Sequence, residues 1–514
     1  MFQYEFVLNV STFVNIKNKK NKKLNVAIIG SGIGGMALSI RLARKGYKVT
    51  LFEKNAYPGG KLSELCLDGF RFDKGPSLLT MPSLIDELTD IAGSNRKFNY
   101  KKLETITNYF YPDGTQLKAS ANLNEFSNEV QSKLNEKKAT VLNYLKRNAF
   151  YFNTTEDLFL KQSLHEIKNF INFKTLKGVF LSPFLGLFKS MNKQNEATFN
   201  NPKTVQLFNR YATYNGSNPY KAPALMNMIS HLEFNLGAYI PYEGMHQITT
   251  HLVNLLTDLG VTIKYNQNVE KILVSNTNKT EGLLSNGISH NFDVVVSDID
   301  IHVVYNKMLE EKFKPKKLLS QEKSSSAYVF YWGIKKEFEQ LGLHNILFSN
   351  DYKTEFEKLF NDQSPCDDPT IYINITSKHC PKDAPKGCEN WFVMVNVPHN
   401  TNTSINYSVE IRKNVVAKIN SILKTNIEEY IVAENTLTPF DIEKQTSSIG
   451  GSLYGNSSNN KFAAFLRHSN YSSKIKGLYF VGGSVHPGGG IPLCLWSAKI
   501  ASELIFKKSK NDSI

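Results

Sequence analysis

The sequence NVAIIGSGIGGMALSIRLARKGYKVTLFEK occupies residues 25–54 and has the pattern strand, glycine turn, helix, strand. Residues 26–29 form a short β-branched run of the kind found in buried parallel strands. The run GSGIGG at residues 30–35 fits G-x-G-x-x-G, and a helical pattern follows that ends at Gly46. Residues 48–52 form the second strand. The stretch therefore predicts a βαβ unit whose helix begins at the glycine turn.

Three glycines and one acid in this unit predict a dinucleotide site. Gly30 allows the tight turn, Gly32 lets the backbone approach a pyrophosphate, and Gly35 lets the helix pack close to the sheet. The helix N-terminus offers unpaired N–H groups and the positive end of its dipole to the phosphates. Glu53 ends the second strand, 18 residues after Gly35, where its carboxylate can accept the ribose hydroxyls of an adenosine.

The residues after Glu53 favour FAD over NAD. Together with Glu53, Gly59, Gly60 and Lys61 resemble the second half of the dinucleotide motif in flavoproteins of the glutathione-reductase superfamily, in its amine-oxidase and carotenoid-desaturase branch. The resemblance implies FAD, with Gly60 and Lys61 near its pyrophosphate and ribityl chain. Lys61 stands where relatives usually have Arg, which keeps the charge but loses the bidentate fork. The position of Cys494 does not match a covalent flavin link, so we expect non-covalent FAD.

The same resemblance implies that later segments complete the FAD site. Val269 matches a residue whose backbone contacts the adenine in relatives, and Gly483 and Ile491 belong to a C-terminal turn and helix start that would face the flavin. We therefore predict an α/β fold, with a discontinuous FAD-binding Rossmann-like domain and an interleaved α+β substrate domain. The predicted FAD-binding domain takes residues 24–105, 236–300 and 476–510, and the substrate domain takes residues 106–235 and 301–475.

Four stretches resemble bacterial carotenoid desaturases of the phytoene-desaturase type over nearly all of residues 24–506. They are the N-terminal motif through DKGPS at 73–77, NPYKAP at 218–223, EGM at 243–245 and HPGGGIP at 486–492. Residues 210–220 (RYATYNGSNPY) and 482–488 (GGSVHPG) resemble 1-hydroxycarotenoid 3,4-desaturases more closely. The resemblance implies desaturation of a carotenoid by hydride transfer to FAD, with 3,4-desaturation of a 1-hydroxycarotenoid favoured and phytoene desaturation as the alternative.

A 1-hydroxyl group on the substrate would need a polar partner inside an apolar tunnel. Leaving that hydroxyl unpaired costs on the order of 1–3 kcal/mol. The candidate partners are Arg210, Tyr211, Tyr214 and Asn215. The alternative for these residues is a packed helix end in which the tyrosines are part of the core.

Two histidines are further candidates for the substrate pocket. His231 precedes Glu233 by two residues, and the pair predicts either acid/base chemistry or a structural hydrogen bond. His486 predicts either a turn histidine bonded to a backbone carbonyl or a residue at the flavin face. No catalytic base is assigned, because the developing cation is delocalised into the polyene and the substrate itself lowers the barrier.

Composition narrows the class of protein. At roughly 150 residues per domain, a chain of this length predicts about three structural units. The five cysteines include no C-x-x-C pair, so no metal site is expected. No second Rossmann fingerprint occurs, so we expect a quinone or oxygen rather than NAD(P)H as the redox partner of the flavin. The net charge of +15 is compatible with an anionic membrane surface, and no nucleic-acid motif accompanies it.

Two segments bear on localisation. Residues 1–23 are interpreted as a mobile basic extension, because the charge cluster at 17–23 follows the apolar stretch, in the opposite order to a secretory signal. Residues 170–189 are rich in Phe and Lys, lack acids and are too interrupted to span a bilayer, which is typical of an interfacial segment. A buried helix pair is the alternative. We expect a cytoplasmic protein that associates peripherally with membranes.

Two other functions fit the same motifs in part. An oxidase of amines or porphyrinogens on this fold would have less need of the segment at 170–189. A non-catalytic escort for prenyl lipids would tend to lose the flavin motif, whereas every glycine of that motif is present here.

Overall fold

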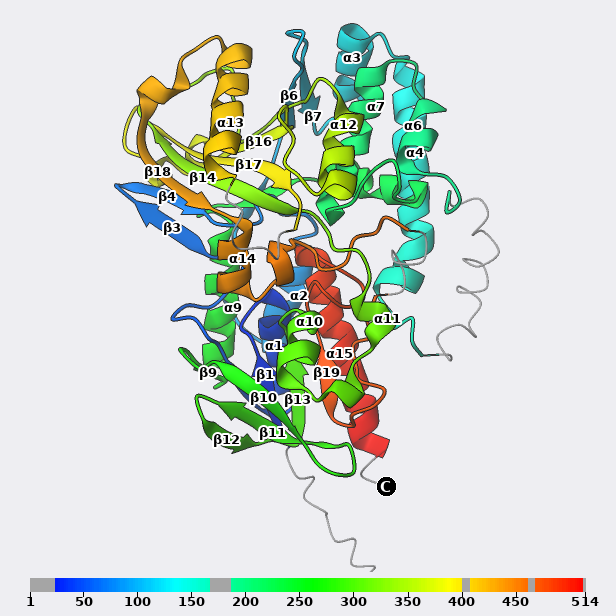
Figure 1. Ribbon diagram of the computed structural model, residues 1–514, viewed down its shortest axis with the longest axis vertical. Helices are drawn as coiled ribbons and strands as arrows, with labels where there is room; N and C mark the ends of the chain where they lie inside the picture. The colour runs from blue at the N-terminus through cyan, green and yellow to red at the C-terminus, as the bar shows by residue number, and fades with distance from the viewer. Residues whose placement is uncertain (1–23, 167–185, 400–406, 461–466, 512–514) are drawn as a thin grey trace, which may run out of the picture.

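The lower part of the molecule in Figure 1 is built on a five-stranded parallel sheet. The computed structural model describes residues 24–166, 186–399, 407–460 and 467–511. In sheet order the strands are β19 (Leu478–Phe480), β13 (Val294–Ser297), β1 (Asn25–Ile29), β2 (Lys48–Phe52) and β9 (Thr262–Lys264). Val26 of β1 lies between Val294 and Val49, so β1 is the central strand. The predicted α/β class with a parallel sheet is confirmed.

Both faces of this sheet are covered, as a parallel sheet requires. Val26 and Ile28 face a core shared with α1 (Ile33–Arg44), α2 (Ser83–Ala92), α9 (His246–Asp258) and α15 (Ile491–Asn511). Ala27 and Ile29 face the opposite core, which includes residues of a three-stranded antiparallel sheet. The strands of that second sheet are β10 (Val269–Val274), β11 (Thr280–Ser285) and β12 (Ile288–Asn291).

The upper part of the molecule contains a seven-stranded mixed sheet (Figure 1). Its longest strands, β14 and β17, pair with each other, and Trp332 lies opposite Trp391 in this pair. Every residue of β14 is buried, so both faces of this strand are packed. In sheet order the strands are β18 (Ile431–Leu437), β14 (Ser326–Ile334), β17 (Glu389–Val397), β16 (Ile371–Ile375), β15 (His344–Leu347), β6 (Thr105–Phe110) and β7 (Gln116–Ser120).

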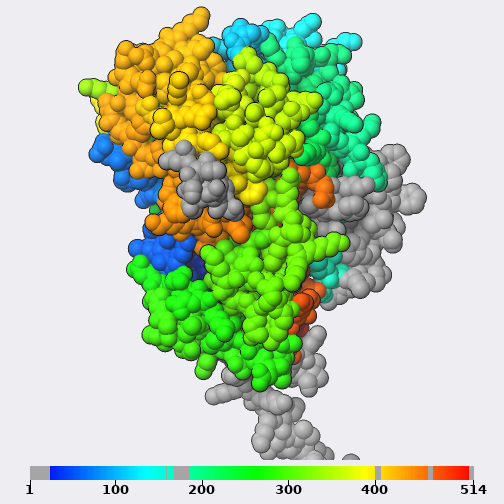
Figure 2. All heavy atoms as spheres, in the orientation of Figure 1, coloured from blue at the N-terminus to red at the C-terminus, as the bar shows by residue number. Residues whose placement is uncertain are grey.

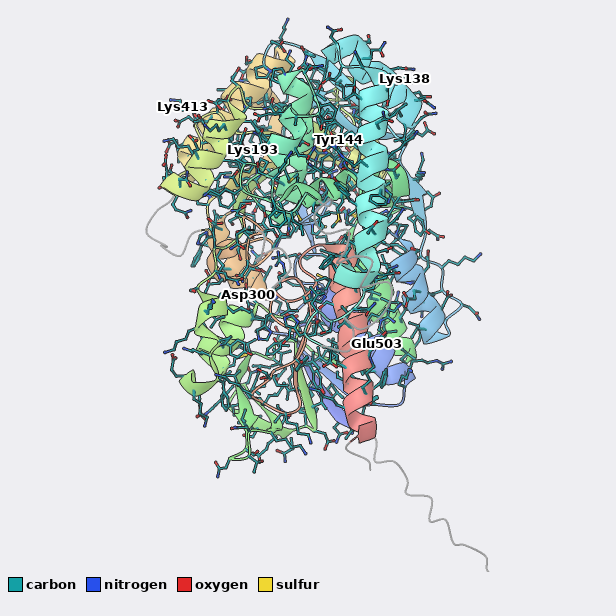
Figure 3. The ribbon with its side chains drawn as sticks, turned by 90° about the vertical axis from the view of Figure 1, so that its right-hand side faces the viewer. Lys138, Tyr144, Lys193, Asp300, Lys413 and Glu503 are labelled. Carbon is teal, nitrogen blue, oxygen red and sulfur yellow. The ribbon has the colours of Figure 1, made fainter. Side chains whose placement is uncertain are left out.

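Helices pack beside the upper sheet and connect it to the lower part. The strands β6, β7 and β15 share one core with α3 (Leu123–Leu134), α4 (Lys138–Thr155), α6 (Met191–Glu196), α7 (Pro202–Asn209) and α12 (Tyr352–Glu357), while α13 (Ser408–Leu423) packs on the central strands. Figure 3 shows α4 running from Lys138 in the upper part toward α15 in the lower part. The last turns of α4 contribute Tyr151 and Phe152 to the core that contains Trp496 of α15. This helix therefore ties the two parts together.

Two segments pack across the predicted domain boundaries. In the hairpin β3 (Glu64–Leu67) and β4 (Phe70–Asp73), Phe72 packs against Tyr331 of the upper sheet, with ring centroids 5.6 Å apart. Residues 301–313 were predicted to belong to the substrate domain but pack on the lower part, because Ile301 and Phe313 join the core on one face of the parallel sheet. The space-filling view shows the upper and lower parts in continuous contact (Figure 2). The exact boundaries between the two domains stay predictions.

The two segments on which the localisation argument depends lie largely beyond what the structure describes. Residues 1–23 fall outside the described ranges, as does most of the candidate membrane segment at 170–189. At its end, Phe188 is 74% exposed. Among the described helices, none has both the length and the apolar character needed to cross a bilayer.

We predict that Trp391→Ala strongly destabilises the upper sheet. The Trp391 side chain is fully buried, its Nε1 donates to Glu389 Oε2 at 2.7 Å, and its ring packs edge-on against Phe338. Truncating such a residue costs about 3–5 kcal/mol through lost burial and the cavity that remains. The midpoint of urea unfolding of the FAD-loaded protein should fall accordingly. Phe440→Ala, at a half-exposed position, should change it little; comparable shifts for the two variants would contradict the prediction.

Candidate active site

A cavity of about 660 Å³ lies at the carboxyl ends of the parallel strands. We call it the glycine-loop cavity, because residues of the G-x-G-x-x-G turn form one of its walls. Ligands of open α/β sheets bind at this edge. The sequence-predicted cofactor residues that line the cavity are Gly30, Gly32, Glu53, Gly60, Lys61, Val269, Gly483 and Ile491. Gly35 is not among the lining residues, and it lies one turn into α1, behind the loop.

The turn between β1 and α1 has no room for a side chain at its glycine positions. Gly30 has a φ of 94°, which favours glycine, and its N–H donates to Phe52 O at 2.8 Å. A Cβ on Gly32 would lie 2.6 Å from Asp298 Oδ2, and a Cβ on Gly35 would lie 2.6 Å from Gly30 O. The backbone of the loop is therefore exposed to the cavity at Gly32, while Gly35 allows the close approach of the helix to the strand.

The carboxylate of Glu53 is held at the end of β2 by three hydrogen bonds. Its Oε2 accepts from Ser31 N at 3.0 Å and from Ser31 Oγ at 2.8 Å, and its Oε1 accepts from Asn55 N at 2.9 Å. Glu53 is buried and lines the cavity. A fixed carboxylate at this position has lone pairs left to accept the hydroxyls of a ribose.

Asp298 is an acid of this site that the sequence analysis did not identify. It directly follows β13, so it lies at the same sheet edge as the glycine turn, and that position was the available signal. Burial is the main cause that raises the pKa of Asp298 to about 7; the charge of nearby Glu53 acts in the same direction, and the backbone N–H groups of Gly35 and Gly32 oppose it. The carboxyl thus shares the N-terminus of α1 with any anion that binds there.

A second cavity, of about 380 Å³, extends from the glycine-loop cavity into the upper part of the molecule. We call it the apolar cavity, since its walls include Phe152, Met228, Val329 and Phe392. The two cavities share part of their walls. The residues that line both are Gly60, Lys61, Pro76, Gln445, Thr446, Leu453, Tyr454, Gly489, Gly490 and Ile491.

Lys61 stands at this shared wall with its ammonium group bonded to backbone. Its Nζ donates to Leu453 O at 2.7 Å and to Ser452 O at 3.3 Å. Burial lowers the pKa of Lys61 to about 8, although Asp300 and Cys494 oppose that shift. The side chain therefore carries a positive charge at neutral pH where the cavities meet.

A buried polar cluster borders the apolar cavity in the upper part of the molecule. Arg210 Nη2 donates to Tyr109 Oη at 2.8 Å and lies 3.4 Å from Glu233 Oε2. Tyr211 and Tyr214 each donate a hydroxyl hydrogen bond to the Glu233 carboxylate. The pKa of Glu233 is raised by burial in spite of Arg210, and the pKa of Arg210 is raised because its charged and phenolic partners outweigh burial.

The structure separates the four candidate hydroxyl partners. Arg210, Tyr214 and Asn215 line the apolar cavity, whereas Tyr211 is fully buried against Glu233 and is not a lining residue. Asn215 Oδ1 accepts from Arg467 Nη2 at 3.2 Å, and its Nδ2 donates to Ser458 Oγ at 2.7 Å.

The two histidine candidates have different surroundings. The ring of His231 packs against Phe152, and neither of its nitrogens has a hydrogen-bond partner among the described residues, so it does not bond Glu233. His486 lines the apolar cavity, and its Nε2 lies 2.7 Å from Gln162 O. Burial lowers the pKa of His486 to about 4, which keeps the ring neutral at physiological pH. His486 is therefore a histidine bonded to a backbone carbonyl, as one of the two sequence-based alternatives predicted, and it also lines the apolar cavity.

Arg467 is a second residue of the site that the sequence analysis did not identify. It is buried, lines the apolar cavity and donates to the backbone oxygens of Tyr454 and Gly483, which line the glycine-loop cavity. No short motif surrounds it, so nothing in the sequence marks it. Across the described ranges, no group of three or more His, Cys, Asp or Glu residues is arranged to hold a metal ion.

Comparisons with known proteins agree with this geometry. A family model described as flavin containing amine oxidoreductase matches residues 33–506. A 1-hydroxycarotenoid 3,4-desaturase from Flavobacterium sp. (strain P99-3) is 50% identical over 93% of this chain and 98% of that protein. A 4,4'-diapolycopene oxygenase from Methylomonas sp is 31% identical over 94% and 98%. A solved structure of putrescine oxidase bound to putrescine has a TM-score of 0.61 at 14% identity, with 94% and 99% covered, which supports the fold alone.

The glycine-loop cavity fits FAD, the cofactor that the comparisons establish. Its wall has exposed backbone at Gly32, a helix N-terminus for the pyrophosphate, and the fixed carboxylate of Glu53 for the adenosine ribose. Its other end meets the apolar cavity at Gly489 and Ile491, where a flavin ring would reach a substrate.

We predict that FAD affinity falls above pH 7 because of Asp298. The protonated carboxyl is neutral and tolerates the pyrophosphate at the same helix N-terminus, whereas the ionised form repels it. With a pKa of about 7, binding should be strongest below that pH and weaken by up to about tenfold per unit above it. Asp298→Asn, which is neutral at every pH, should lose this dependence in titrations of the apoprotein with FAD at pH 6 and pH 8. An unchanged pH dependence in the variant would contradict the assignment.

Proposed function

Since the chain belongs to the flavin-containing amine oxidoreductase family and uses FAD, we propose that it desaturates a carotenoid, and specifically that it is a 3,4-desaturase of 1-hydroxycarotenoids. The reaction removes two hydrogen atoms from neighbouring carbons of the isoprenoid chain. The relative with half of its residues identical to this chain is a 1-hydroxycarotenoid 3,4-desaturase, which supports this choice of substrate.

The observation that carries the proposal is the junction of the two cavities. An apolar cavity, lined by side chains such as Phe152, Met228 and Phe392, suits a long hydrocarbon. It shares Gly60, Lys61 and residues 489–491 with the glycine-loop cavity. A carotenoid in the apolar cavity would therefore lie against the ring end of FAD.

We propose that the cofactor residues act as a set. Gly30, Gly32 and Gly35 would place the α1 N-terminus at the pyrophosphate, and Glu53 would bond the adenosine ribose. The remaining contacts would come from Gly60, Lys61, Val269, Gly483 and Ile491.

The polar cluster near Arg210 is the proposed binding place for the substrate hydroxyl. Arg210 and Tyr214 line the apolar cavity, and both are oriented by Glu233. A side chain that is already held in place loses little entropy when it binds. A substrate hydroxyl beside Tyr214 would find a partner on a wall that also carries apolar side chains such as Met228 and Val329.

Bound FAD supplies the acceptor for a hydride from the substrate. The protein positions the substrate and excludes water from it. The apolar walls would hold the isoprenoid chain so that one of its C–H bonds faces the cofactor. The positive charge that develops on the chain is allylic and delocalised, so the neighbouring proton is acidic and does not need a strong base. With its pKa near 4, His486 is a weak base at the wall and serves to shape it.

The proposal extends to the membrane and to the oxidant. A carotenoid dissolves in lipid, so the protein would collect its substrate at a bilayer surface. Its net charge of +15 and the exposed Phe188, near the end of the segment at 170–189, would aid this association. We therefore propose that the protein is cytoplasmic and binds peripherally to the membrane that contains its substrate. Reduced FAD would pass its electrons to a quinone or to oxygen.

Expression in cells that make acyclic carotenoids with or without a 1-hydroxyl tests the proposed function. The expected result is a loss of two mass units and a red shift of absorption only with the hydroxylated pigment. Conversion of colourless phytoene would indicate a phytoene desaturase instead. No change in any pigment, despite bound FAD, would contradict carotenoid desaturation and favour an oxidase of other substrates.

Two tyrosines allow a matched test of hydroxyl recognition. Both donate to Glu233, but only Tyr214 lines the apolar cavity. We expect Tyr214→Phe to lower kcat/KM for the hydroxylated carotenoid about tenfold, since one lost hydrogen bond costs about 1–3 kcal/mol. Binding of the analogue without the hydroxyl, measured as an inhibition constant, should stay the same. Tyr211→Phe should leave both values near those of the original protein; equal effects of the two substitutions would contradict the assignment.

A further inference from the structure

Arg467 lies where the two cavities meet and is held by three separate segments of the chain, at Asn215, at 454–456 and at 483–488. Its Nη1 donates to Tyr454 O at 2.9 Å and to Gly483 O at 3.3 Å. Its Nη2 donates to Asn456 O at 2.9 Å and to Asn215 Oδ1 at 3.2 Å. Nε approaches the turn before α15, since a Cβ on Gly488 would lie 3.1 Å from it. The guanidinium is thus fixed beside the ring end of the glycine-loop cavity.

The charge of Arg467 has no counter-ion in the part of the chain that the structure describes. The four oxygen atoms that accept hydrogen bonds from Arg467 are all neutral, and the one group that favours its charged form electrostatically is the Cys494 thiol. Burial raises the pKa of that thiol to about 12, so it is uncharged. Burial also lowers the pKa of Arg467, but only to about 10, so the guanidinium stays protonated at neutral pH.

The other buried arginines of the molecule show what is unusual here. Arg210 has Glu233 as its partner, and Arg41 donates to Glu87 Oε1 at 3.1 Å. A buried cation without an anion costs several kcal/mol of free energy, and proteins normally avoid that cost by pairing. At the junction, Lys61 is a second cation, and its Nζ donates to two backbone carbonyls. Asp300 raises the pKa of Lys61 and the neighbouring His486 is neutral, so among the described residues Arg467 is the cation here that no acid offsets.

We infer that Arg467 is the electrostatic partner of the reduced flavin. A hydride taken from a substrate C–H bond brings two electrons and one negative charge to the flavin ring system, while the proton leaves the substrate separately. A fixed cation at that end of the cavity stabilises the charge where it develops and needs no reorganisation. The counter-ion that Arg467 lacks is therefore supplied by the reaction itself. The inference rests on the proposed function only through the bound FAD.

The alternative is that Arg467 only links these three segments through its hydrogen bonds. Two substitutions separate the roles: Arg467→Lys keeps the charge and loses most donors, whereas Arg467→Gln keeps an amide donor and loses the charge. If Arg467 only links the segments, both variants should be less stable and the reduction potential of the flavin should not change. If Arg467 is the electrostatic partner, the potential should fall in the variant that loses the positive charge and stay the same in the variant that keeps it.

The experiment measures the two-electron reduction potential of the FAD-loaded variants and their dissociation constants for sulfite, which adds to oxidised flavin and leaves a negative charge on the same ring. For Arg467→Gln we expect the equilibrium constant for reduction to fall at least about tenfold, a shift of about 30 mV to lower potential. Sulfite binding should weaken by a similar factor. Arg467→Lys should stay close to the original protein in both, and so should the control Arg41→Gln, which removes a paired buried arginine from α1.

Equal potentials and sulfite affinities in Arg467→Gln and the original protein would overturn the inference, as would equal shifts in Arg467→Gln and Arg467→Lys. Neither measurement uses a carotenoid, so both test the role of Arg467 even if the proposed substrate is wrong. If the variants lose FAD, the original protein decides the question through its pH dependence. An anionic reduced flavin takes up one proton per two electrons, so the potential should fall about 30 mV per pH unit between about pH 5.5 and 6.5.

A slope of about twice that value would mean that the reduced flavin is neutral in the protein, and it would overturn the inference. The chosen pH range lies below the pKa of Lys61, about 8, and that of Asp298, about 7, and above that of His486, about 4. Lys61 therefore stays protonated there, Asp298 stays mostly protonated, and His486 and Cys494 stay neutral.

Discussion

The cofactor and a long apolar substrate must touch within one protein, and the residues that line both cavities provide this contact. These residues come from the loop after β2 (60–61), the turn at 76, the segments 445–446 and 453–454, and the turn that begins α15 (489–491). They are drawn from both parts of the molecule seen in Figure 1, so the junction exists only when the parallel sheet and the mixed sheet are packed together. The link made by α4 and the hairpin β3–β4 keeps that packing in place.

Buried charges are arranged differently at the two ends of the apolar cavity. Near the upper sheet, Arg210 is neutralised by Glu233 and surrounded by phenols, an arrangement that presents hydrogen-bonding groups without a net charge. At the junction, every hydrogen bond that Arg467 and Lys61 donate within the described ranges goes to a neutral oxygen. A neutral polar group suits a substrate hydroxyl, whereas an unpaired cation suits an acceptor that becomes anionic. The cluster at Arg210 thus suits the proposed substrate hydroxyl, and the site at Arg467 suits the flavin that accepts the hydride.

The sequence predicted those parts of the site that are local in the chain. Gly30, Gly32, Gly35 and Glu53 all lie within a single βαβ unit, where spacing alone determines their positions. Asp298 and Arg467 reach the site only because segments far apart in sequence fold together, and neither belongs to a motif. Tyr211 and Tyr214 are one turn apart in a short helix, and which of them faces the cavity depends on Glu233 in another segment. The parallel sheet was predicted for the same local reason as the glycine turn, while the packing of residues 301–313 under it was not.

Anaerobic mixing of the FAD-loaded protein with a 1-hydroxylated acyclic carotenoid in lipid vesicles tests most directly whether electrons cross the junction of the two cavities. The account predicts that oxidised-flavin absorbance is lost in proportion to a red-shifted pigment that is two hydrogens lighter. Pigment conversion with the flavin still oxidised, or no change in either chromophore, would contradict it.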